Sequence, residues 1–111
     1  MLAAVSEGDR RGDARRKVSV AASIVRADGK ERLSLVRDLS ASGARMLVAT
    51  RKVTAGETVR LTIHVDTGIE HETTARLLRV REAEAGIWKC EVACSFDERL
   101  PIDLTKVTES D

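Results

Sequence analysis

The stretch IWKCEVACSF, residues 87–96, alternates apolar and polar side chains with a period of two. One set of alternate positions is wholly apolar and consists of Trp88, Cys90, Val92, Cys94 and Phe96. Successive side chains of a β-strand point to opposite faces. This alternation is therefore typical of a strand with one face in the core and the other in water. It makes β-structure the first expectation for the chain.

Two more segments alternate in the same way and are predicted to be strands. Their inward residues would be Val18, Val20, Ala22 and Ile24 in the first, and Val59, Leu61, Ile63 and Val65 in the second. The pair Asp28–Gly29 follows the first segment, and Asp-Gly is a strong signal for a hairpin turn. The chain would then return through ERLSLVRD, residues 31–38, with Leu33 and Leu35 facing the core.

Two further segments complete a set of six predicted strands. One, ARMLVAT, begins after Gly43, and the other, TTARLLRVRE, breaks its alternation at Leu77–Leu78. The break indicates either a β-bulge or a strand that is covered on both faces. Six short strands separated by turns predict an all-β fold, a small six-stranded antiparallel β-barrel.

The end of the chain changes to helical spacing. In ERLPIDLTKV, residues 98–107, three apolar residues recur at this spacing, namely Leu100, Leu104 and Val107. Pro101 can be accommodated in a first helical turn, where its missing N–H does no harm. We therefore expect a short C-terminal α-helix that covers the barrel.

The length of 111 residues allows one domain with a single hydrophobic core. We expect a flexible N-terminus over residues 1–8, the barrel domain over residues 9–108 and a tail over residues 109–111. No stretch approaches the roughly 20 apolar residues that a membrane-spanning helix needs. We expect a cytoplasmic protein without a membrane partner.

The composition argues against several classes of function. A net charge of +1 at pH 7 is too small for broad electrostatic binding to DNA or RNA. One Trp, one Phe and no Tyr leave no aromatic platform for single-stranded nucleic acid. No phosphate-binding glycine loop, nucleophile elbow or HExxH motif is present, so we expect no enzymatic activity.

The cysteines and histidines are interpreted as structural. Cys90 and Cys94 would lie about 13 Å apart on one strand, whereas a disulfide needs Cα atoms within about 7 Å. We expect two reduced thiols in the core. With a two-residue turn, His64 and His71 would face each other across a hairpin, but two imidazoles are too few ligands for zinc. We expect surface histidines and no metal or other cofactor.

Positive charge is nevertheless concentrated in RRGDARRKV, residues 10–18, where five of nine residues are basic. A second unusual segment is RDLSASGAR, residues 37–45. Its Asp38 and Ser40 lie two residues apart and are predicted to point outward, away from the core face of the preceding strand. Gly43 would permit either a positive φ or a close approach of the backbone to another group. An ordinary turn stabilised by Asp or Ser remains the alternative for this segment.

Taken together, the two segments resemble the motifs of the PilZ domain family. Arg11 and Arg15 match the family motif RxxxR, and Arg10 matches the additional arginine that often precedes it. The second motif, [D/N]xSxxG, is matched by Asp38, Ser40 and Gly43. Arg16 and Lys17 fall outside the pattern. Ala93 stands where many members carry glycine, away from both motifs.

The resemblance implies a receptor for cyclic di-GMP, a bacterial second messenger. Arginine suits both phosphate oxygens and the O6/N7 edge of guanine, and a carboxylate accepts hydrogen bonds from guanine N–H groups. The implied ligand-binding residues are Arg10, Arg11, Arg15, Asp38, Ser40 and Gly43. In the family, an arginine in front of RxxxR often accompanies the binding of two ligand molecules.

The implied function is a stand-alone effector. Its N-terminal arginine loop would change conformation when cyclic di-GMP binds, and the signal would pass to a downstream protein partner. The alternative is a PilZ-like adaptor that does not bind the ligand and acts only through protein–protein contacts.

Overall fold

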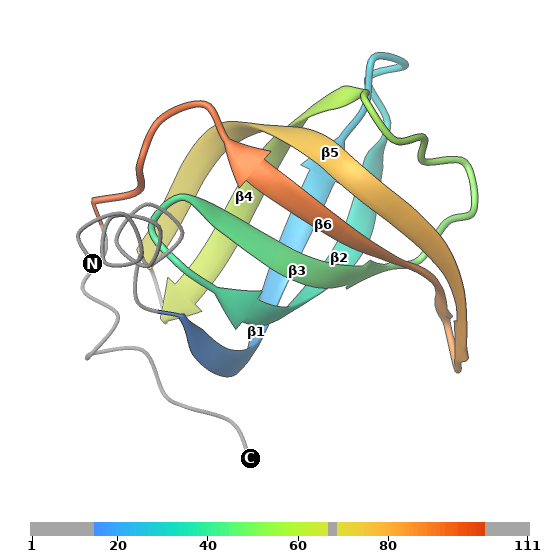
Figure 1. The fold of residues 1–111 in the computed structure, drawn as a ribbon, viewed down its shortest axis with the longest axis horizontal. Helices are drawn as coiled ribbons and strands as arrows, with labels where there is room; N and C mark the ends of the chain where they lie inside the picture. Colours follow the sequence, from blue (N-terminus) through green and yellow to red (C-terminus); the bar gives the residue numbers. More distant parts are fainter. Residues whose placement is uncertain (1–14, 67–68, 102–111) are drawn as a thin grey trace, which may run out of the picture.

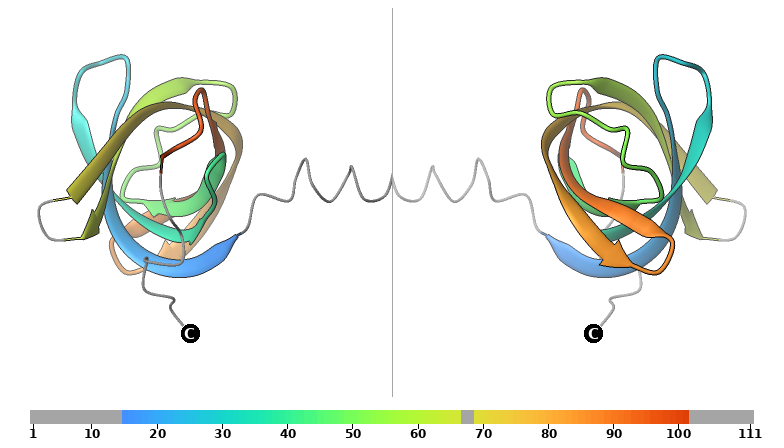
Figure 2. Two further views of the ribbon diagram at one scale, coloured as in Figure 1. Left: turned by 90° about the vertical axis from the view of Figure 1, so that its left-hand side faces the viewer. Right: turned by 90° about the vertical axis from the view of Figure 1, so that its right-hand side faces the viewer.

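The computed structural model describes residues 15–66 and 69–101, which form six strands (Figure 1). The strands are β1 (Arg16–Val25), β2 (Glu31–Leu39), β3 (Gly43–Val48), β4 (Thr58–Asp66), β5 (Ile69–Ala85) and β6 (Trp88–Phe96). They close into a barrel in the order β1-β2-β3-β6-β5-β4, and neighbouring strands are antiparallel throughout. The side views in Figure 2 show the strands surrounding one interior. The predicted all-β, six-stranded fold is confirmed.

Some of the expectations concern segments that the structure does not describe. The predicted flexible N-terminus, the C-terminal helix beyond Pro101 and the C-terminal tail lie outside the described residues. Across residues 15–66 and 69–101, no helix is long and apolar enough to span a membrane.

The interior of the barrel is lined by the alternating apolar residues of its strands. The inward residues predicted for β1, Val18, Val20, Ala22 and Ile24, are all buried. In β4 and β6 the same holds for the central positions, while Val65 and Trp88 at the strand ends are only partly buried. Complete burial of a Leu, Ile or Val side chain contributes about 1.5–3 kcal/mol to stability. The alternation found in the sequence is thus the main source of the core.

For β2 the predicted orientation is wrong. Ser34 and Val36 face the core, whereas Leu33 is exposed and Leu35 is half-buried on the outside. The inward hydroxyl of Ser34 is satisfied, because it donates a 2.9 Å hydrogen bond to the carbonyl oxygen of Leu47. A buried polar group that is hydrogen-bonded costs little, so a serine can take a core position while two leucines stay outside.

A β-bulge interrupts β2 at its C-terminal end. The pairing with β3 shifts between Val36 and Asp38, and the pairing of β1 with β2 shifts nearby, between Lys17 and Val20. An extra residue in one strand reverses the faces of those that follow. Leu39 therefore returns to the core while Asp38 stays on the outside. The outward prediction for Asp38 is confirmed, although the reasoning from Leu33 and Leu35 was wrong.

The break at Leu77–Leu78 is a second bulge. The register of β5 against β6 shifts between Leu77 and Arg79, so Leu77 is buried and Leu78 is exposed. Of the two explanations for the break, the bulge is the correct one.

A register shift also separates the two histidines. His64 pairs with Glu70, and His71 pairs with Ile63, so the expected His64–His71 pair does not form. The Nδ1 atom of His64 lies 3.0 Å from a carboxylate oxygen of Glu70. In the described part of the chain, no group of three or more His, Cys, Asp or Glu residues could hold a metal ion.

Candidate functional site

The bulge in β2 places Asp38 between two arginines. The Nη1 atom of Arg15, just before β1, lies 3.5 Å from Asp38 Oδ1, and the Nη2 atom of Arg45, on β3, lies 3.4 Å from Oδ2. The Asp38 side chain is only 13% exposed, whereas that of Arg15 is 57% exposed. A largely covered carboxylate is thus held beneath two solvent-accessible guanidinium groups.

One oxygen of this carboxylate receives no hydrogen bond from the described residues. Asp38 Oδ1 is buried, and no hydrogen bond to it is formed by any residue that the structure describes. At 3.5 Å, Arg15 is close enough for an ion pair with this oxygen but too distant for a strong hydrogen bond. Because buried acceptors are nearly always satisfied, this oxygen is suited to receive a donor from another molecule.

A cavity of about 330 Å³ opens beside Asp38. Its lining includes Arg15, Asp38, Arg45, Leu78, Arg79 and Ala93. Three guanidinium groups against one carboxylate make the cavity cationic, and exposed Leu78 adds an apolar side chain. The cavity offers anion-binding groups beside a surface on which a planar ring could rest.

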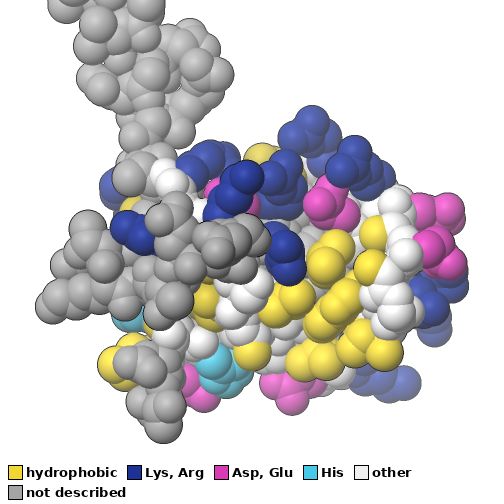
Figure 3. Space-filling model, turned by 90° about the horizontal axis from the view of Figure 1, so that it is seen from below, with side chains coloured by type: hydrophobic (Ala, Val, Ile, Leu, Met, Phe, Trp, Pro, Cys, Tyr) yellow, Lys and Arg dark blue, Asp and Glu magenta, His cyan; other side chains and the backbone are white. Residues whose placement is uncertain are grey.

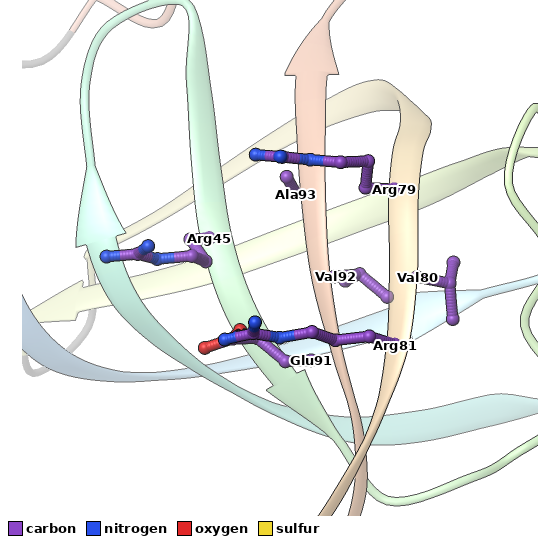
Figure 4. Close-up of a pocket in the computed structure, with 7 residues that line it drawn as sticks. All are labelled: Arg45, Arg79, Val80, Arg81, Glu91, Val92 and Ala93. Carbon is purple, nitrogen blue, oxygen red and sulfur yellow. Dashed lines mark hydrogen bonds and ion pairs between the residues drawn. The ribbon is translucent and has the colours of Figure 1, made fainter.

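A second cavity, of about 260 Å³, continues along the same outer face (Figure 4). The two cavities share three residues, Arg45, Ala93 and Arg79, which lie opposite one another across β3, β6 and β5. In Figure 4 the side chain of Arg79 extends from β5 across Ala93. The small side chain of Ala93 leaves room for the two arginines. The two cavities adjoin at these shared residues, and we call them together the cationic trough.

Arg81 closes the trough at its far end. Its guanidinium pairs with Glu91 on β6, at 2.6 Å from Nη2 to a carboxylate oxygen. Because Glu91 neutralises Arg81, the excess of positive charge lies at the Asp38 end, where Arg15, Arg45 and Arg79 surround a single carboxylate.

Ser40 lies two residues beyond Asp38 but not in the cavity. It is 2% exposed, so the prediction that it faces outward is wrong. Its hydroxyl oxygen accepts hydrogen bonds from the backbone N–H groups of Gly43, at 3.1 Å, and Ser42, at 3.3 Å. The hydroxyl also lies 3.2 Å from the Gly43 carbonyl oxygen, to which it donates. The Ser40 side chain points inward because it makes these hydrogen bonds, which stabilise the turn between β2 and β3.

Gly43 is required by a close backbone contact. A Cβ atom at this position would lie 2.6 Å from the backbone carbonyl oxygen of Cys94 on β6, which is well inside van der Waals contact. Positive φ values among the described glycines occur at Gly29, Gly56 and Gly86. Of the two explanations considered for Gly43, close approach to another group is therefore correct, and here that group is β6.

The two thiols lie in the core, as expected. Cys90 and Cys94 are buried and unbridged. Burial raises the pKa of the Cys94 thiol to about 12, so this group stays protonated near neutral pH although its strand lines the cavity. A reactive thiolate is thereby excluded at this position.

The structure brings together only part of the predicted site. Arg15 and Asp38 meet, Ser40 and Gly43 build the adjoining turn, and Arg10 and Arg11 lie outside the described residues. Arg45 and Arg79 also line the cavity and were not predicted from the sequence. Alternation from Gly43 would have placed Arg45 on the outer face, whereas Arg79 reaches that face through the bulge in β5, which the sequence leaves open.

The sequence matches the model of one known protein family. A family model described as the PilZ domain matches residues 9–109. The chain belongs to the PilZ domain family. PilZ domains are a family of cyclic di-GMP receptor domains, and the motif residues described above lie within the matched range. No curated protein matches the sequence.

Solved structures with the same fold include other PilZ proteins. The PilZ domain of YcgR from Escherichia coli, solved with c-di-GMP, has a TM-score of 0.62 at 16% identity; the match covers 75% of this chain and 74% of that one. The inhibitor of motility MotI/DgrA from Bacillus subtilis has a TM-score of 0.63 at 21% identity, over 84% of this chain and 44% of that one. This PilZ chain therefore spans less than half the length of MotI/DgrA.

Proposed function

We propose that this PilZ domain is a cytoplasmic receptor for cyclic di-GMP and passes the signal to a protein partner. The observation that carries the proposal is Asp38. Its buried Oδ1 has no hydrogen bond from the described residues, and it lies in a cavity lined by Arg15, Arg45 and Arg79. A ligand with guanine N–H donors and two phosphates would complement these groups.

The chemistry divides among the residues in a simple way. Asp38 would accept hydrogen bonds from the N–H edge of a guanine. Arg15, together with Arg10 and Arg11, would bind phosphate oxygens or the guanine O6/N7 edge through paired N–H donors. Ser40 and Gly43 would contribute by shaping the turn that holds Asp38 in place.

Arg15 offers a route from binding to a conformational response. Its contact with Asp38 is long and its side chain is largely exposed, so little is lost when Asp38 exchanges this partner for a guanine. Arg15 would then be available to the phosphates, and the arginine segment would close over the ligand. Ordering of a segment by a bound phosphate is an established form of switching.

The experiment that tests the proposal is a calorimetric titration of cyclic di-GMP into the full chain. We expect saturable binding that is abolished by Arg11→Ala and by Arg15→Ala. Arg60→Ala serves as the matched control, because Arg60 is also an exposed, ion-paired arginine but lies on β4, away from the cavity. The stoichiometry shows whether Arg10 accompanies one or two ligand molecules.

Thermal unfolding provides an independent readout. A ligand at 100 times its dissociation constant stabilises the folded state by about 2.7 kcal/mol. The absence of both heat and stabilisation in the wild type would contradict the proposal and favour an adaptor that acts through protein contacts alone.

A further inference from the structure

The outer face of β2 carries an unusual order of side chains. Because β2 turns its leucines outward, four consecutive outer positions read Glu31, Leu33, Leu35 and Arg37. The order is acid, apolar, apolar, base. Leu33 is 51% exposed, and Glu31 and Arg37 are also exposed. Leu35 between them is half-buried.

The apolar surface extends onto the neighbouring strands. Leu35 pairs with Ala21 on β1 and with Leu47 on β3, so three apolar side chains lie in one row on the outer face of the sheet. Ala21 is exposed in this row, whereas Leu35 and Leu47 are half-buried. Figure 3 shows apolar side chains gathered over this face of the barrel, with Lys and Arg along one margin. The patch therefore consists of Leu33, Leu35, Leu47 and Ala21, which we call the leucine face.

The charges at the two ends of the leucine face are not neutralised by the residues that the structure describes. Glu31 and Arg37 form no side-chain ion pair with any residue that the structure describes. At the Arg37 end, a cavity of about 490 Å³ is lined by Lys17, Arg37 and Arg45 together with Leu47 and one carboxylate, that of Glu91. Glu91 is already paired with Arg81, so three cations remain at this end. This end can accept a carboxylate, and the opposite end presents one on Glu31.

We propose that the leucine face is a self-association surface on which a second copy of this chain packs about a two-fold axis level with Ser34. Such an axis reverses β2 and places Glu31 of one copy opposite Arg37 of the other. Leu33 then faces Leu35 of the second copy. An interface of this kind is isologous, because each copy contributes the same patch. The acid–apolar–apolar–base order is self-complementary only in this antiparallel arrangement, which is why a second copy fits better than an unrelated protein.

The size of the patch sets the strength of the contact. From Glu31 to Arg37 the strand covers roughly 20 Å, and the three strands β1, β2 and β3 span roughly 14 Å, at strand spacings of about 4.8 Å. Stable complexes bury about 800 Å² on each partner, well above this footprint. The dimer is therefore weak and forms at high local concentration. The two symmetry-related ion pairs between Glu31 and Arg37 add orientation more than affinity.

The test is sedimentation equilibrium of the full chain without nucleotide, from about 10 μM to about 1 mM, the range expected for a small interface. We expect the mean mass to rise with concentration toward that of two chains. Glu31→Arg and Arg37→Glu each turn two attractive pairs into repulsive ones and should weaken association about tenfold or more. The double variant Glu31→Arg/Arg37→Glu restores opposite charges and should return to within about threefold of the wild type.

The contribution of the apolar side chains of the leucine face is tested with one substitution on the face and one control substitution elsewhere. Leu33→Ser should weaken association, whereas Ile87→Ser should not, because Ile87 is 56% exposed but lies in the turn between β5 and β6. All the substituted positions are on the surface, and circular dichroism checks that each variant folds. A monomer at all concentrations, or a double variant as weak as the single ones, would overturn the proposal. Because no nucleotide is present, the result is independent of whether cyclic di-GMP binds.

Discussion

Asp38 and the turn Ser40–Gly43 belong to one short motif, yet the structure uses them in opposite ways. The Asp38 carboxylate lies at a cationic cavity and keeps one oxygen without a hydrogen bond from the described residues. The Ser40 hydroxyl accepts hydrogen bonds from the backbone N–H groups of Ser42 and Gly43. Gly43 itself lies too close to the backbone of β6 to carry a Cβ atom. Half of the motif is thus available for a ligand, while the other half holds the backbone that positions it.

The comparison predicts that Gly43→Ala has the largest effect on stability. The new Cβ would lie 2.6 Å from the Cys94 carbonyl oxygen, and because its nearest neighbours are all backbone atoms of β6, there is little room to relax. We expect a loss of about 3 kcal/mol in the free energy of unfolding, measured by urea denaturation.

Gly29→Ala provides the control for this clash. Gly29 has a φ of +77°, but a Cβ added there would meet no atom within 4 Å, so only backbone strain of about 1 kcal/mol is expected. Equal effects at both glycines would contradict the role assigned to the contact with β6.

Ser40→Ala should have the next largest effect on stability. The substitution leaves two backbone N–H groups of the turn without their acceptor, which costs about 1–2 kcal/mol. Urea denaturation measures the loss. Ser42→Ala is the control, since among the described residues the Ser42 hydroxyl makes a single, 3.5 Å contact, with Ser40. If Ser40→Ala removed ligand binding at full stability, Ser40 would belong with Asp38 rather than with the turn.

Asp38→Asn should have a small effect on stability and a large one on binding. Its ion pairs are 3.4–3.5 Å long and involve exposed arginines, so their removal should change the free energy of unfolding by less than about 1 kcal/mol. The amide replaces an acceptor by a donor at one position, and calorimetry should show cyclic di-GMP affinity reduced at least about tenfold. Unchanged affinity would place the ligand elsewhere.

Arg79→Ala should have the smallest effect on stability. Arg79 is exposed and lines both cavities, so its removal should leave the unfolding free energy within about 0.5 kcal/mol of the wild type. We expect calorimetry to show weaker binding, by about threefold to tenfold, since one guanidinium of the trough is lost. A wild-type affinity would confine the site to Asp38 and Arg15.

The inward face of a strand can be predicted from the sequence where the strand has one clearly apolar face. In β1, β4 and β6 the choice between two sets of alternate residues is decided by transfer free energy alone, and the predicted sets are buried at all but the strand ends. In β2 that rule fails, because Ser34 finds a hydrogen-bond acceptor in the Leu47 carbonyl across the sheet. A partner thirteen residues away cannot be read from the alternation of one strand.

In the candidate site, too, some residues could be predicted from local sequence and others depend on contacts between strands. The motif residues Arg15 and Asp38 were identified from their sequence context, and they do lie together. Arg45 and Arg79 were missed, because they meet only through the pairing of β3 and β5 with β6 on either side.

By itself, then, the sequence determined the six strands, most of their inward faces and the two motifs that resemble the PilZ family. These properties depend on neighbouring residues, whose periodicity and chemistry are local. The tertiary structure alone decided the register at the bulges, the burial of Ser40, the contact of Gly43 with Cys94 and the outward leucines of β2. Each of these depends on hydrogen bonds or packing between strands distant in the chain, and these exist only once the barrel has closed.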